Sequence, residues 1–326
     1  MEQRTVGSTD VRVSAIGFGC MALSSTYRPT DDASSVALVH RALELGVTHL
    51  DTSDAYGWGH NEKLLSTALA GRRDQVFLAS KFGQLMQDGQ RIVRGDAEYV
   101  RAACHASLGR LGTDHIDLYY AHRIDPTVPI EETIGAMAEL IDAGKVRHIG
   151  VSEAAPATIR RAHAAHPIAA VQVEYSLWTR FAEEEIFGVC EELGIGYVAY
   201  SPIGRGFLSG TIKATEDLDE SDGRRQHPRF AQENIDRNID TLRALQDVAV
   251  THGASPAQVA LAWVLAIRPY LLPIPGTTSA DHLEENVAAA DIALTPDEVE
   301  QLAAVFEPSL IAGERYPAGA LAKVQI

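Results

Sequence analysis

Eight short apolar or β-branched runs alternate with amphipathic stretches along the 326 residues, and this alternation predicts an α/β protein of the (β/α)8 TIM-barrel class. Several of the runs are continuously apolar, as expected for parallel strands covered on both faces. No change in composition and no Pro/Ser-rich linker divides the chain, so we expect one barrel domain over residues 1–326. A doubly wound open sheet would alternate in the same way, but the count of eight favours the barrel.

The predicted strands are short and rich in residues that favour extended backbone. They span residues 15–19, 48–51, 76–80, 116–121, 146–151, 169–174, 196–201 and 271–275.

Helical patterns lie between these strands. They cover residues 31–45, 60–70, 96–111, 130–143, 156–165 and 182–193. Asp31 is placed to cap the first pattern, Pro156 lies in the first turn of the fifth, and Gly46, Gly144 and Gly194 follow the ends of three patterns. Acidic or proline starts and glycine stops are the expected helix boundaries.

Two segments depart from the repeat. Residues 1–14 contain VGSTDVRV, which predicts a β-hairpin that closes the barrel floor. Residues 204–232 form a long polar, Gly-rich loop after the seventh strand. Loops of this length are usually functional or disordered, so this one is a candidate part of a binding site.

The charge balance excludes polyanionic partners. The chain has 28 Lys and Arg against 44 Asp and Glu, a formal net charge of −16, and no basic block. Nucleic acids and anionic membranes attract concentrated positive charge, so we expect neither as a partner. Any anionic ligand must therefore be held by local groups.

The cysteine pattern and the N-terminus predict a cytoplasmic protein. Cys20, Cys104 and Cys190 are too few and too scattered for a disulfide framework. The chain begins without a basic start and apolar stretch, and it has no run of about 18 apolar residues. His163 and His166 lack a third ligand nearby, so we expect no metal site. The oligomeric state, a homo-oligomer included, stays open.

Reactive residues follow three neighbouring strands. In a (β/α)8 barrel the functional groups come from the C-terminal ends of the strands. Asp51 ends the second strand, Tyr56 follows it, Lys81 ends the third strand and His122 ends the fourth. Neighbouring strands lie about 4.8 Å apart, so these groups can meet. Asp51 and Lys81 alone could be a structural ion pair, but the coincidence of four favours a catalytic site.

The four side chains would form a proton-transfer site. The ordinary pKa of tyrosine is about 10, so Tyr56 needs a group that stabilises its phenolate. An ammonium from Lys81 would do this, and Asp51 would hold that ammonium. His122 could orient a carbonyl oxygen or share in the proton relay. Such a site protonates a carbonyl oxygen while hydride reaches the carbon.

Two other dehydrogenase patterns fit less well. Residues 17–22 (GFGCMA) match G-x-G-x-x-A, but a loop rather than a helix is expected to follow, and no acidic residue lies about 20 positions beyond Gly19. The Tyr-x-x-x-Lys pair of short-chain dehydrogenases is absent, because none of the ten tyrosines has lysine four residues later.

Several blocks of the sequence resemble the aldo-keto reductase superfamily in order and spacing. These blocks are GVTHLDTSDAYGWGHNEKLLSTAL, VFLASKFG, HIDLYYAHRID and KVRHIGVSE. Further blocks resemble the bacterial and fungal reductases of aryl aldehydes, pyridoxal and related small carbonyls: VPIEETIGAMAELIDAGKVRHIGVSEA, VEYSLW, SPIGRGFLSG and GERYP. The resemblance implies an NADPH-dependent carbonyl reductase, with NADH as another possible cofactor. It implies that Tyr56 is the general acid, that Lys81 and Asp51 tune it, and that His122 orients the substrate.

The same resemblance implies a set of cofactor-binding residues. Ser152 and Gln172 would bind the carboxamide and Tyr200 would stack on the nicotinamide. Glycine-rich segments with free backbone donors can cradle a pyrophosphate, and a turn before a helix N-terminus is a natural phosphate site. The full set is Gly19, Cys20, Met21, Ser152, Gln172, Tyr200, Ser201, Pro202, Gly204, Arg205, Leu208, Gly210, Gly276, Thr277, Thr278, Ser279, His282, Glu285 and Asn286.

Two positions depart from the family pattern. Many relatives carry lysine or arginine where this chain has residues 276–279 (GTTS), and His282 stands in a common arginine position. Discrimination for NADPH is therefore open, with Arg205 as a candidate for the missing charge. Glu153 stands where many relatives have asparagine, and its carboxylate can accept but not donate a hydrogen bond.

The resemblance also extends to the β-subunits of potassium channels, where the barrel serves a partner protein. A cofactor-binding regulatory subunit is therefore the alternative function. This chain keeps all four catalytic residue types and shows nothing like a long N-terminal inactivating segment, so the enzyme is favoured.

Overall fold

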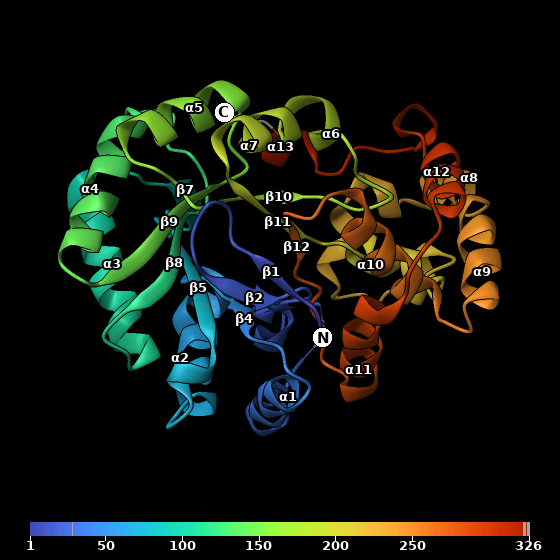
Figure 1. Cartoon of the computed structure of the whole chain (residues 1–326), viewed down its shortest axis with the longest axis horizontal. Coiled ribbons are helices and arrows are strands. Elements are labelled where there is room, and N and C mark those ends of the chain that lie inside the picture. The colour runs from blue at the N-terminus through green and yellow to red at the C-terminus, as the bar shows by residue number, and fades with distance from the viewer. Residues whose placement is uncertain (28, 322–323, 325–326) are drawn as a thin grey trace.

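Eight parallel strands form one curled sheet at the centre of the molecule (Figure 1). The computed structural model describes residues 1–27, 29–321 and 324. The strands pair in chain order and confirm the eight predicted runs within one or two residues at most ends. They are β3 (Phe18–Gly19), β4 (His49–Asp51), β5 (Phe77–Phe82), β8 (Ile116–Ala121), β9 (Val146–Ser152), β10 (Ala170–Glu174), β11 (Gly196–Tyr200) and β12 (Leu271–Pro273).

Backbone hydrogen bonds close the sheet into a barrel. The N–H of Gly17 donates to the carbonyl of Pro273 at 2.9 Å, and the N–H of Gly19 donates to that of Pro275 at 3.1 Å. These bonds join the first barrel strand to the last. The two segments approach so closely that a Cβ on Gly19 would lie 2.7 Å from the carbonyl oxygen of Ile274. The (β/α)8 barrel predicted from the sequence is confirmed.

The predicted N-terminal hairpin lies across the barrel floor. It consists of β1 (Gln3–Thr5) and β2 (Arg12–Ser14), which pair antiparallel. The guanidinium of Arg4 donates to the carbonyls of Leu265 and Leu271 at 2.8 and 3.0 Å, which ties the hairpin to the last βα unit. Val6 and Val13 pack against the apolar side chains inside the barrel.

Five of the predicted helices occur as single helices. They are α1 (Asp32–Glu44), α2 (His60–Ala68), α3 (Ala97–Leu111), α4 (Ile130–Asp142) and α5 (Pro156–Ala165). The sixth prediction was wrong in one respect, because residues 182–193 form two helices, α6 (Ala182–Glu185) and α7 (Phe187–Leu193). The break is at Ile186, whose φ of −109° departs from helical geometry while its side chain is fully buried.

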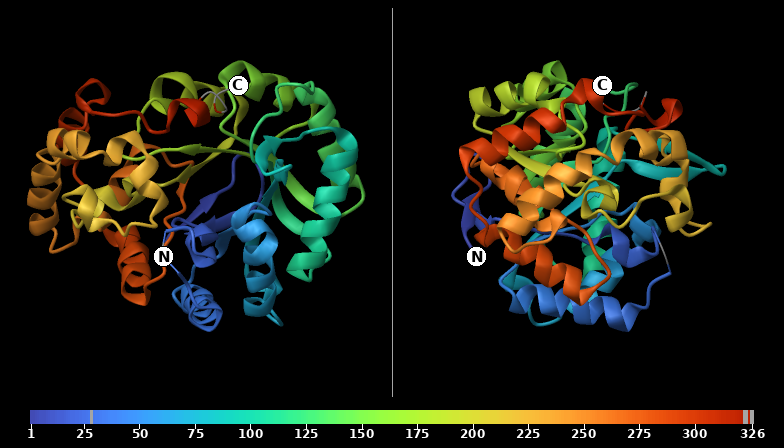
Figure 2. Two further views of the ribbon diagram at one scale, coloured as in Figure 1. Left: turned by 180° about the vertical axis from the view of Figure 1, so that it is seen from behind. Right: turned by 90° about the vertical axis from the view of Figure 1, so that its right-hand side faces the viewer.

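The C-terminal third adds helices around β12 (Figure 2). They are α8 (Gln232–Asn238), α9 (Thr241–Thr251), α10 (Pro256–Ile267), α11 (Ala280–Ala288), α12 (Pro296–Val305) and the short α13 (Ala318–Leu321). No single helix among the described residues is long and apolar enough to cross a membrane; α9 and α10 pass a length and composition test only as a pair bent by 89°.

Smaller elements lie in the loops between the strands and helices. The sequence did not predict the hairpin of β6 (Gln84–Gln87) and β7 (Gln90–Val93), which has no fully buried residue and therefore no buried face to leave a pattern. Short 3-10 helices occupy the rest, and four of them organise the long loop after β11. These helices are η1 (Cys20–Ser24), η2 (Tyr56–Gly59), η3 (Arg73–Gln75), η4 (Gly204–Ser209), η5 (Thr215–Asp217), η6 (Gly223–Gln226), η7 (Pro228–Phe230), η8 (Ala289–Asp291) and η9 (Pro308–Leu310).

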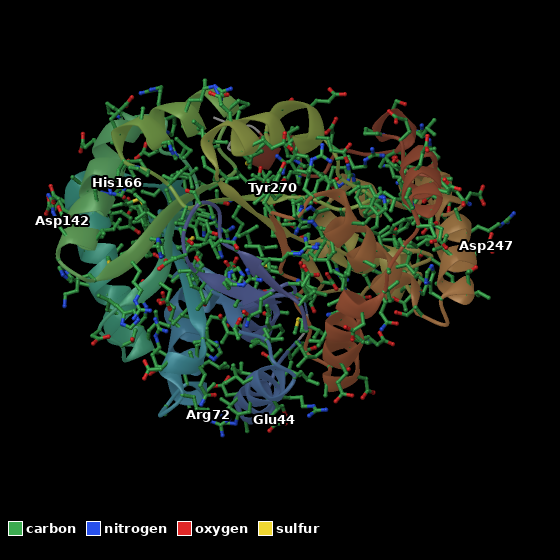
Figure 3. All side chains as sticks on the ribbon, viewed as in Figure 1. Glu44, Arg72, Asp142, His166, Asp247 and Tyr270 are labelled. Atoms are coloured by element: carbon green, nitrogen blue, oxygen red, sulfur yellow. The ribbon has the colours of Figure 1, made fainter. Side chains whose placement is uncertain are left out.

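Successive residues of a strand face two different cores, one between the sheet and the helices and one inside the barrel. On β8, Tyr119 packs outward against the helices and Tyr120 packs inward with Leu118 and Val198. Both faces are apolar, which explains the continuous apolar runs. Acidic side chains such as Glu44, Asp142 and Asp247 lie on the outer helices (Figure 3).

Candidate active site

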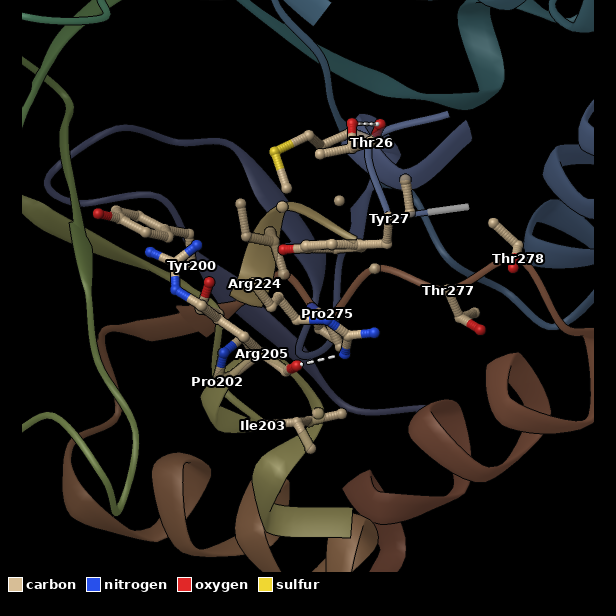
Figure 4. Close-up of a pocket in the computed structure, with 18 of the residues that line it drawn as sticks. Thr26, Tyr27, Tyr200, Pro202, Ile203, Arg205, Arg224, Pro275, Thr277 and Thr278 are labelled. Atoms are coloured by element: carbon tan, nitrogen blue, oxygen red, sulfur yellow. Dashed lines mark hydrogen bonds between the residues drawn. The ribbon is translucent and has the colours of Figure 1, made fainter. Parts of the chain in front are cut away.

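A cavity of about 1110 Å³ opens at the C-terminal ends of the strands. It extends from Tyr200 and Arg205 to Thr277 and Thr278, with Tyr27 between the two ends (Figure 4). Barrel enzymes carry their active sites at this end of the strands. Asp51, Tyr56 and His122 all line the cavity.

Lys81 lies fully buried beneath the cavity, at the centre of the predicted quartet. Its Nζ forms a salt bridge with Asp51, donates to the carbonyl of Thr52 at 2.8 Å and lies 3.3 Å from the hydroxyl of Tyr56. Burial lowers the pKa of Lys81, but Asp51 and Tyr56 outweigh it, and the net shift is upward. The ammonium therefore stays charged beside Tyr56.

Tyr56 is held by an unusual turn. It begins η2, and the two residues after it, Gly57 and Trp58, have φ of 58° and 53° in the left-handed region. Burial raises the pKa of the Tyr56 phenol above its ordinary value, and Lys81 acts in the opposite direction. Burial thus outweighs the tuning that the sequence predicted. The phenol stays protonated and ready to donate.

His122 lies against Tyr56, with the two rings 5.8 Å apart and nearly perpendicular at 87°. Its Nδ1 lies 3.0 Å from the hydroxyl of Ser53, which leaves Nε2 for a ligand. Burial, followed by the charges of Arg123 and Lys81, holds the pKa of His122 well below its usual range. The imidazole is therefore neutral at pH 7 and can donate one hydrogen bond.

Ser152 and Gln172 come from neighbouring strands, β9 and β10, and both line the cavity. The Gln172 amide donates to Asp51 at 2.7 Å, so one side chain connects the predicted carboxamide position to the acid of the quartet. Ser152 Oγ lies 3.5 Å from Nη1 of Arg123.

Glu153, which stands where many relatives have asparagine, has its carboxylate fully engaged by other side chains. Its carboxylate forms a two-point salt bridge with Arg315, at 2.7 and 3.0 Å, and accepts a hydrogen bond from the hydroxyl of Tyr200 at 2.7 Å. Burial raises its pKa, but Arg315 outweighs burial and the net shift is downward. The hydroxyls of Tyr200 and Tyr316 lie 2.9 Å apart. Glu153 thus supports Tyr200 rather than facing the cavity.

Arg205 is also paired. Its guanidinium lies 3.2 Å from the carboxylate of Glu174 and over the ring of Tyr316. The hypothesis that it supplies a free charge for a phosphate therefore lacks support. The loop also contributes Arg224 to the cavity wall, and this guanidinium is paired too: it bonds to Asp222 and to the carbonyl of Arg205 and lies 4.8 Å from the centre of the Tyr27 ring.

The far end of the cavity is formed by the turn after β12 and by α11. Ser279 caps the helix by accepting from the N–H of His282 at 3.5 Å. Thr277, His282, Glu285 and Asn286 line the wall. Between 274 and 286 the lining contains no lysine or arginine.

Most of the predicted cofactor residues lie together on the cavity wall. Those that line it are Gly19, Met21, Ser152, Gln172, Tyr200, Ser201, Pro202, Arg205, Gly276, Thr277, Thr278, His282, Glu285 and Asn286. Those outside the lining are Cys20, Gly204, Leu208, Gly210 and Ser279. Cys20 and Leu208 are fully buried, Gly204 and Gly210 shape η4, and Ser279 is the helix cap.

The structure corrects one step of the argument against a Rossmann motif. The 3-10 helix η1 begins directly after Gly19, where the sequence predicted a loop. It has five residues, and α1 starts only at Asp32. The glycines therefore do not begin the long α-helix that a dinucleotide fingerprint requires.

Some cavity residues were not predicted. They are Arg91, on the unexpected hairpin, Arg123, directly after His122, and Tyr316, near the C-terminus. The position of Arg123 beside a predicted catalytic residue was the one available signal. Trp58 and Tyr27 also line the cavity, whereas Trp178 is buried and stacks on Phe207 with the ring centres 4.1 Å apart.

Comparison with known proteins agrees with this fold. The Aldo/keto reductase family matches residues 15–307. A thermostable aldo-keto reductase in complex with the inhibitor epalrestat is 30% identical, with a TM-score of 0.75 over 94% of this chain and 100% of that one. The holo form of an aldo-keto reductase from Bacillus halodurans is 30% identical, with a TM-score of 0.78 over 98% and 99%. A glycerol dehydrogenase from Gluconobacter oxydans is 25% identical, with a TM-score of 0.85 over 94% and 96%.

The fold and the site define an NAD(P)H-dependent oxidoreductase built on a (β/α)8 barrel. The chain belongs to the aldo/keto reductase family. The cavity fits the family's dinucleotide, because one continuous lining connects Tyr200 with Asn286 and includes Gly276, Thr277 and Thr278 after β12.

Proposed function

We propose that the protein reduces small aldehydes and ketones to alcohols, with NADPH as the preferred cofactor and NADH as an alternative. One observation carries this proposal: a buried ammonium, Lys81, lies between the carboxylate of Asp51 and the hydroxyl of Tyr56 at the floor of the cavity. The three free, buried cysteines support a cytoplasmic location.

The dinucleotide supplies hydride to the carbonyl carbon when bound. The hydroxyl of Tyr56 donates its proton to the carbonyl oxygen as the general acid. Lys81 stabilises the phenolate that results, and Asp51 keeps Lys81 in place. Neutral His122 donates a hydrogen bond from Nε2 and orients the carbonyl oxygen.

We assign the remaining cavity residues to the cofactor. Ser152 and Gln172 bind the carboxamide, and Tyr200, held by Glu153, packs on the nicotinamide. The turn at 276–279 and the N-terminus of α11 receive the adenosine phosphate through backbone N–H groups. The lack of a lysine or arginine on this wall lowers the expected preference for NADPH over NADH.

The first experiment replaces the acid. We expect Tyr56→Phe to lower kcat with NADPH and 4-nitrobenzaldehyde by about 10² to 10⁴-fold, because general acid catalysis is worth that much. Cofactor binding, followed by NADPH fluorescence, should remain. Tyr99→Phe, a change of a tyrosine outside the cavity, is the control and should keep the wild-type rate. Wild-type turnover by Tyr56→Phe would refute the mechanism.

A further inference from the structure

The mouth of the active site holds a guanidinium that the proposed chemistry does not use. Arg123 follows β8 and is half-buried in the cavity wall, next to His122. Its Nη1 donates to the carbonyl of His122 at 2.7 Å and reaches Ser152 Oγ at 3.5 Å. Neither Nε nor Nη2 has a hydrogen bond to any described residue, and no described carboxylate lies within salt-bridge distance.

The carboxylates nearest to this part of the cavity are already neutralised. Each forms a salt bridge with a cation of its own. The pairs are Asp51 with Lys81, Glu153 with Arg315, and Glu174 with Arg205. Arg123 forms no salt bridge of its own with a described residue; the charge of Glu153, which Arg315 already pairs, acts on it only at longer range.

The long loop also brings carboxylates to the cavity, and these are engaged within the loop. Asp222 bonds to the guanidinium of Arg224. Asp217 accepts from the N–H groups of Lys213 and Ala214, and Asp219 accepts from Ser221.

Arg123 acts on the reacting groups themselves. Its charge contributes to the lowered pKa of His122 and opposes the rise that burial causes in the pKa of Tyr56, which places it near the two side chains assigned to the carbonyl oxygen. Arg91 on the β6–β7 hairpin also lowers the pKa of His122 and lies 5.5 Å from the centre of the Trp58 ring. The substrate side of the cavity thus has an inner and an outer cation.

We propose that Arg123 binds an anionic oxygen group on the substrate, so that the preferred substrates are small aldehydes or ketones bearing a carboxylate or a phosphate. This inference rests on the proposed reductase function. A guanidinium with free donors matches such groups in shape and charge, and partial burial strengthens the bond. The anion would fix the substrate while its carbonyl meets Tyr56 and His122.

The test compares aldehydes that differ only in charge. The first pair is 4-carboxybenzaldehyde and methyl 4-formylbenzoate, and the second is glyceraldehyde 3-phosphate and glyceraldehyde. The two pairs separate a carboxylate from a phosphate preference. We expect wild-type kcat/KM with NADPH to favour the anion of at least one pair by about 10- to 100-fold, the usual effect of a hydrogen bond to a charged group. Equal kcat/KM within both pairs would overturn the inference but leave the reductase function intact.

Variants then assign the preference to Arg123. Arg123→Gln should reduce the ratio of kcat/KM, anion over neutral aldehyde, to about 1, and Arg123→Lys should keep part of it, because the charge remains without the planar fork. Arg101→Gln, on the outer face of α3 and paired with Glu139, is the matched control and should keep the wild-type ratio. An unchanged ratio in Arg123→Gln, with weaker NADPH binding instead, would assign Arg123 to the cofactor and overturn the proposal.

The outcomes remain separable if one variant fails to fold. If Arg123→Gln does not fold, the ratio of kcat/KM for anionic over neutral aldehyde is compared between Arg123→Lys and the wild type, and this comparison decides whether Arg123 binds the anion. Absence of turnover on all four aldehydes would refute the reductase function and this inference with it.

Discussion

Lys81 is a fully buried ammonium, and its position explains why the quartet is arranged as it is. An unpaired charge cannot be buried without a large cost, so Asp51 must accompany it. The carbonyl of Thr52 takes a second proton of the ammonium, which leaves the third direction toward Tyr56. The geometry of the quartet therefore follows from satisfying one buried cation.

His49 is the opposite case, a buried titratable group without a partner. It is fully buried on β4, and neither ring nitrogen has a hydrogen bond within the described chain. Burial lowers its pKa from 6.5 to about 4. In the folded protein the His49 imidazole is therefore neutral, because its buried position disfavours protonation.

This shift makes stability depend on pH. Between pH 6.5 and about 4 the unfolded chain binds a proton at His49 that the folded chain does not, so the free energy of unfolding falls as the pH falls through this window. The loss amounts to about 3 kcal/mol once the pH is below both values. We expect His49→Phe to reduce this slope, measured as urea midpoints at pH 4.5 and 7.

The matched control for His49 is an exposed histidine. His105→Gln, on the solvent side of α3, should keep the wild-type difference between the two pH values. If His49→Phe and wild type lost equal stability on acidification, the assignment of the effect to His49 would be wrong.

At the scale of elements, the sequence predicted the repeated strands and helices of the barrel and missed the features that interrupt the repeat. The eight strands and the first five helices follow from apolar periodicity and end signals such as Asp31 and Gly144. The residues of the β6–β7 hairpin are exposed or only partly buried, and its apolar residues do not alternate with polar ones, so no burial pattern marks it. Ile186 breaks a helix because its side chain is drawn into the core, a tertiary effect.

The residues of the site also fall into those that the sequence could predict and those that it could not. The quartet could be predicted because strand ends place Asp51, Lys81 and His122 together whatever the loops do. Arg123 and the Glu153 pair could not, since their roles depend on where distant segments return. Arg315, for example, lies 162 residues from Glu153 in the chain.

Barrel closure depends on two glycines that touch across β3 and β12. A Cβ on Gly276 would lie 2.7 Å from the carbonyl oxygen of Gly19, against rigid backbone. We expect Gly276→Ala to lower the free energy of unfolding by about 1 to 3 kcal/mol, the usual cost of overpacking, and to weaken NADPH binding. Thermal unfolding and NADPH fluorescence would measure the two effects.

The same substitution elsewhere should have the opposite sign. Gly135 lies in the middle of α4, and a Cβ there would meet nothing within 4 Å. Gly135→Ala should therefore stabilise the protein by about 0.5 to 1 kcal/mol. Equal effects of the two changes would show that the close approach at Gly276 does not control stability.

Over the whole molecule, the chain is tied together at both ends of the barrel. The N-terminal hairpin closes the floor through Arg4, and one apolar core extends from Phe18 to Phe306. The C-terminal segment crosses the mouth and inserts Arg315 beside Glu153. A C-terminal residue, Arg315, thus holds Glu153 at the end of β9, and Glu153 in turn supports Tyr200, the tyrosine assigned to the nicotinamide.

The Glu153–Arg315 pair tests this long-range connection. Both side chains are buried, so Arg315→Met leaves a buried carboxylate unpaired and should cost about 3 to 5 kcal/mol in the free energy of unfolding. Glu153→Gln combined with Arg315→Met should cost clearly less than the sum of the single changes. The pKa of Glu153 is lowered by the pair, so its contribution is present at pH 7 and fades as the pH falls below about 4.5. Urea unfolding at pH 7 is the measurement.

An exposed pair provides the comparison for this cycle. Arg160 and Glu192 join α5 to α7 at 2.6 Å, but both side chains are about half exposed, so solvent screens their attraction. Their coupling should be several times smaller than that of Glu153 with Arg315. The buried variants should also weaken NADPH binding, because Tyr200 loses its partner, whereas the exposed variants should not. A buried coupling no larger than the exposed one, with NADPH binding unchanged, would mean that the C-terminal segment covers the barrel without organising its active site.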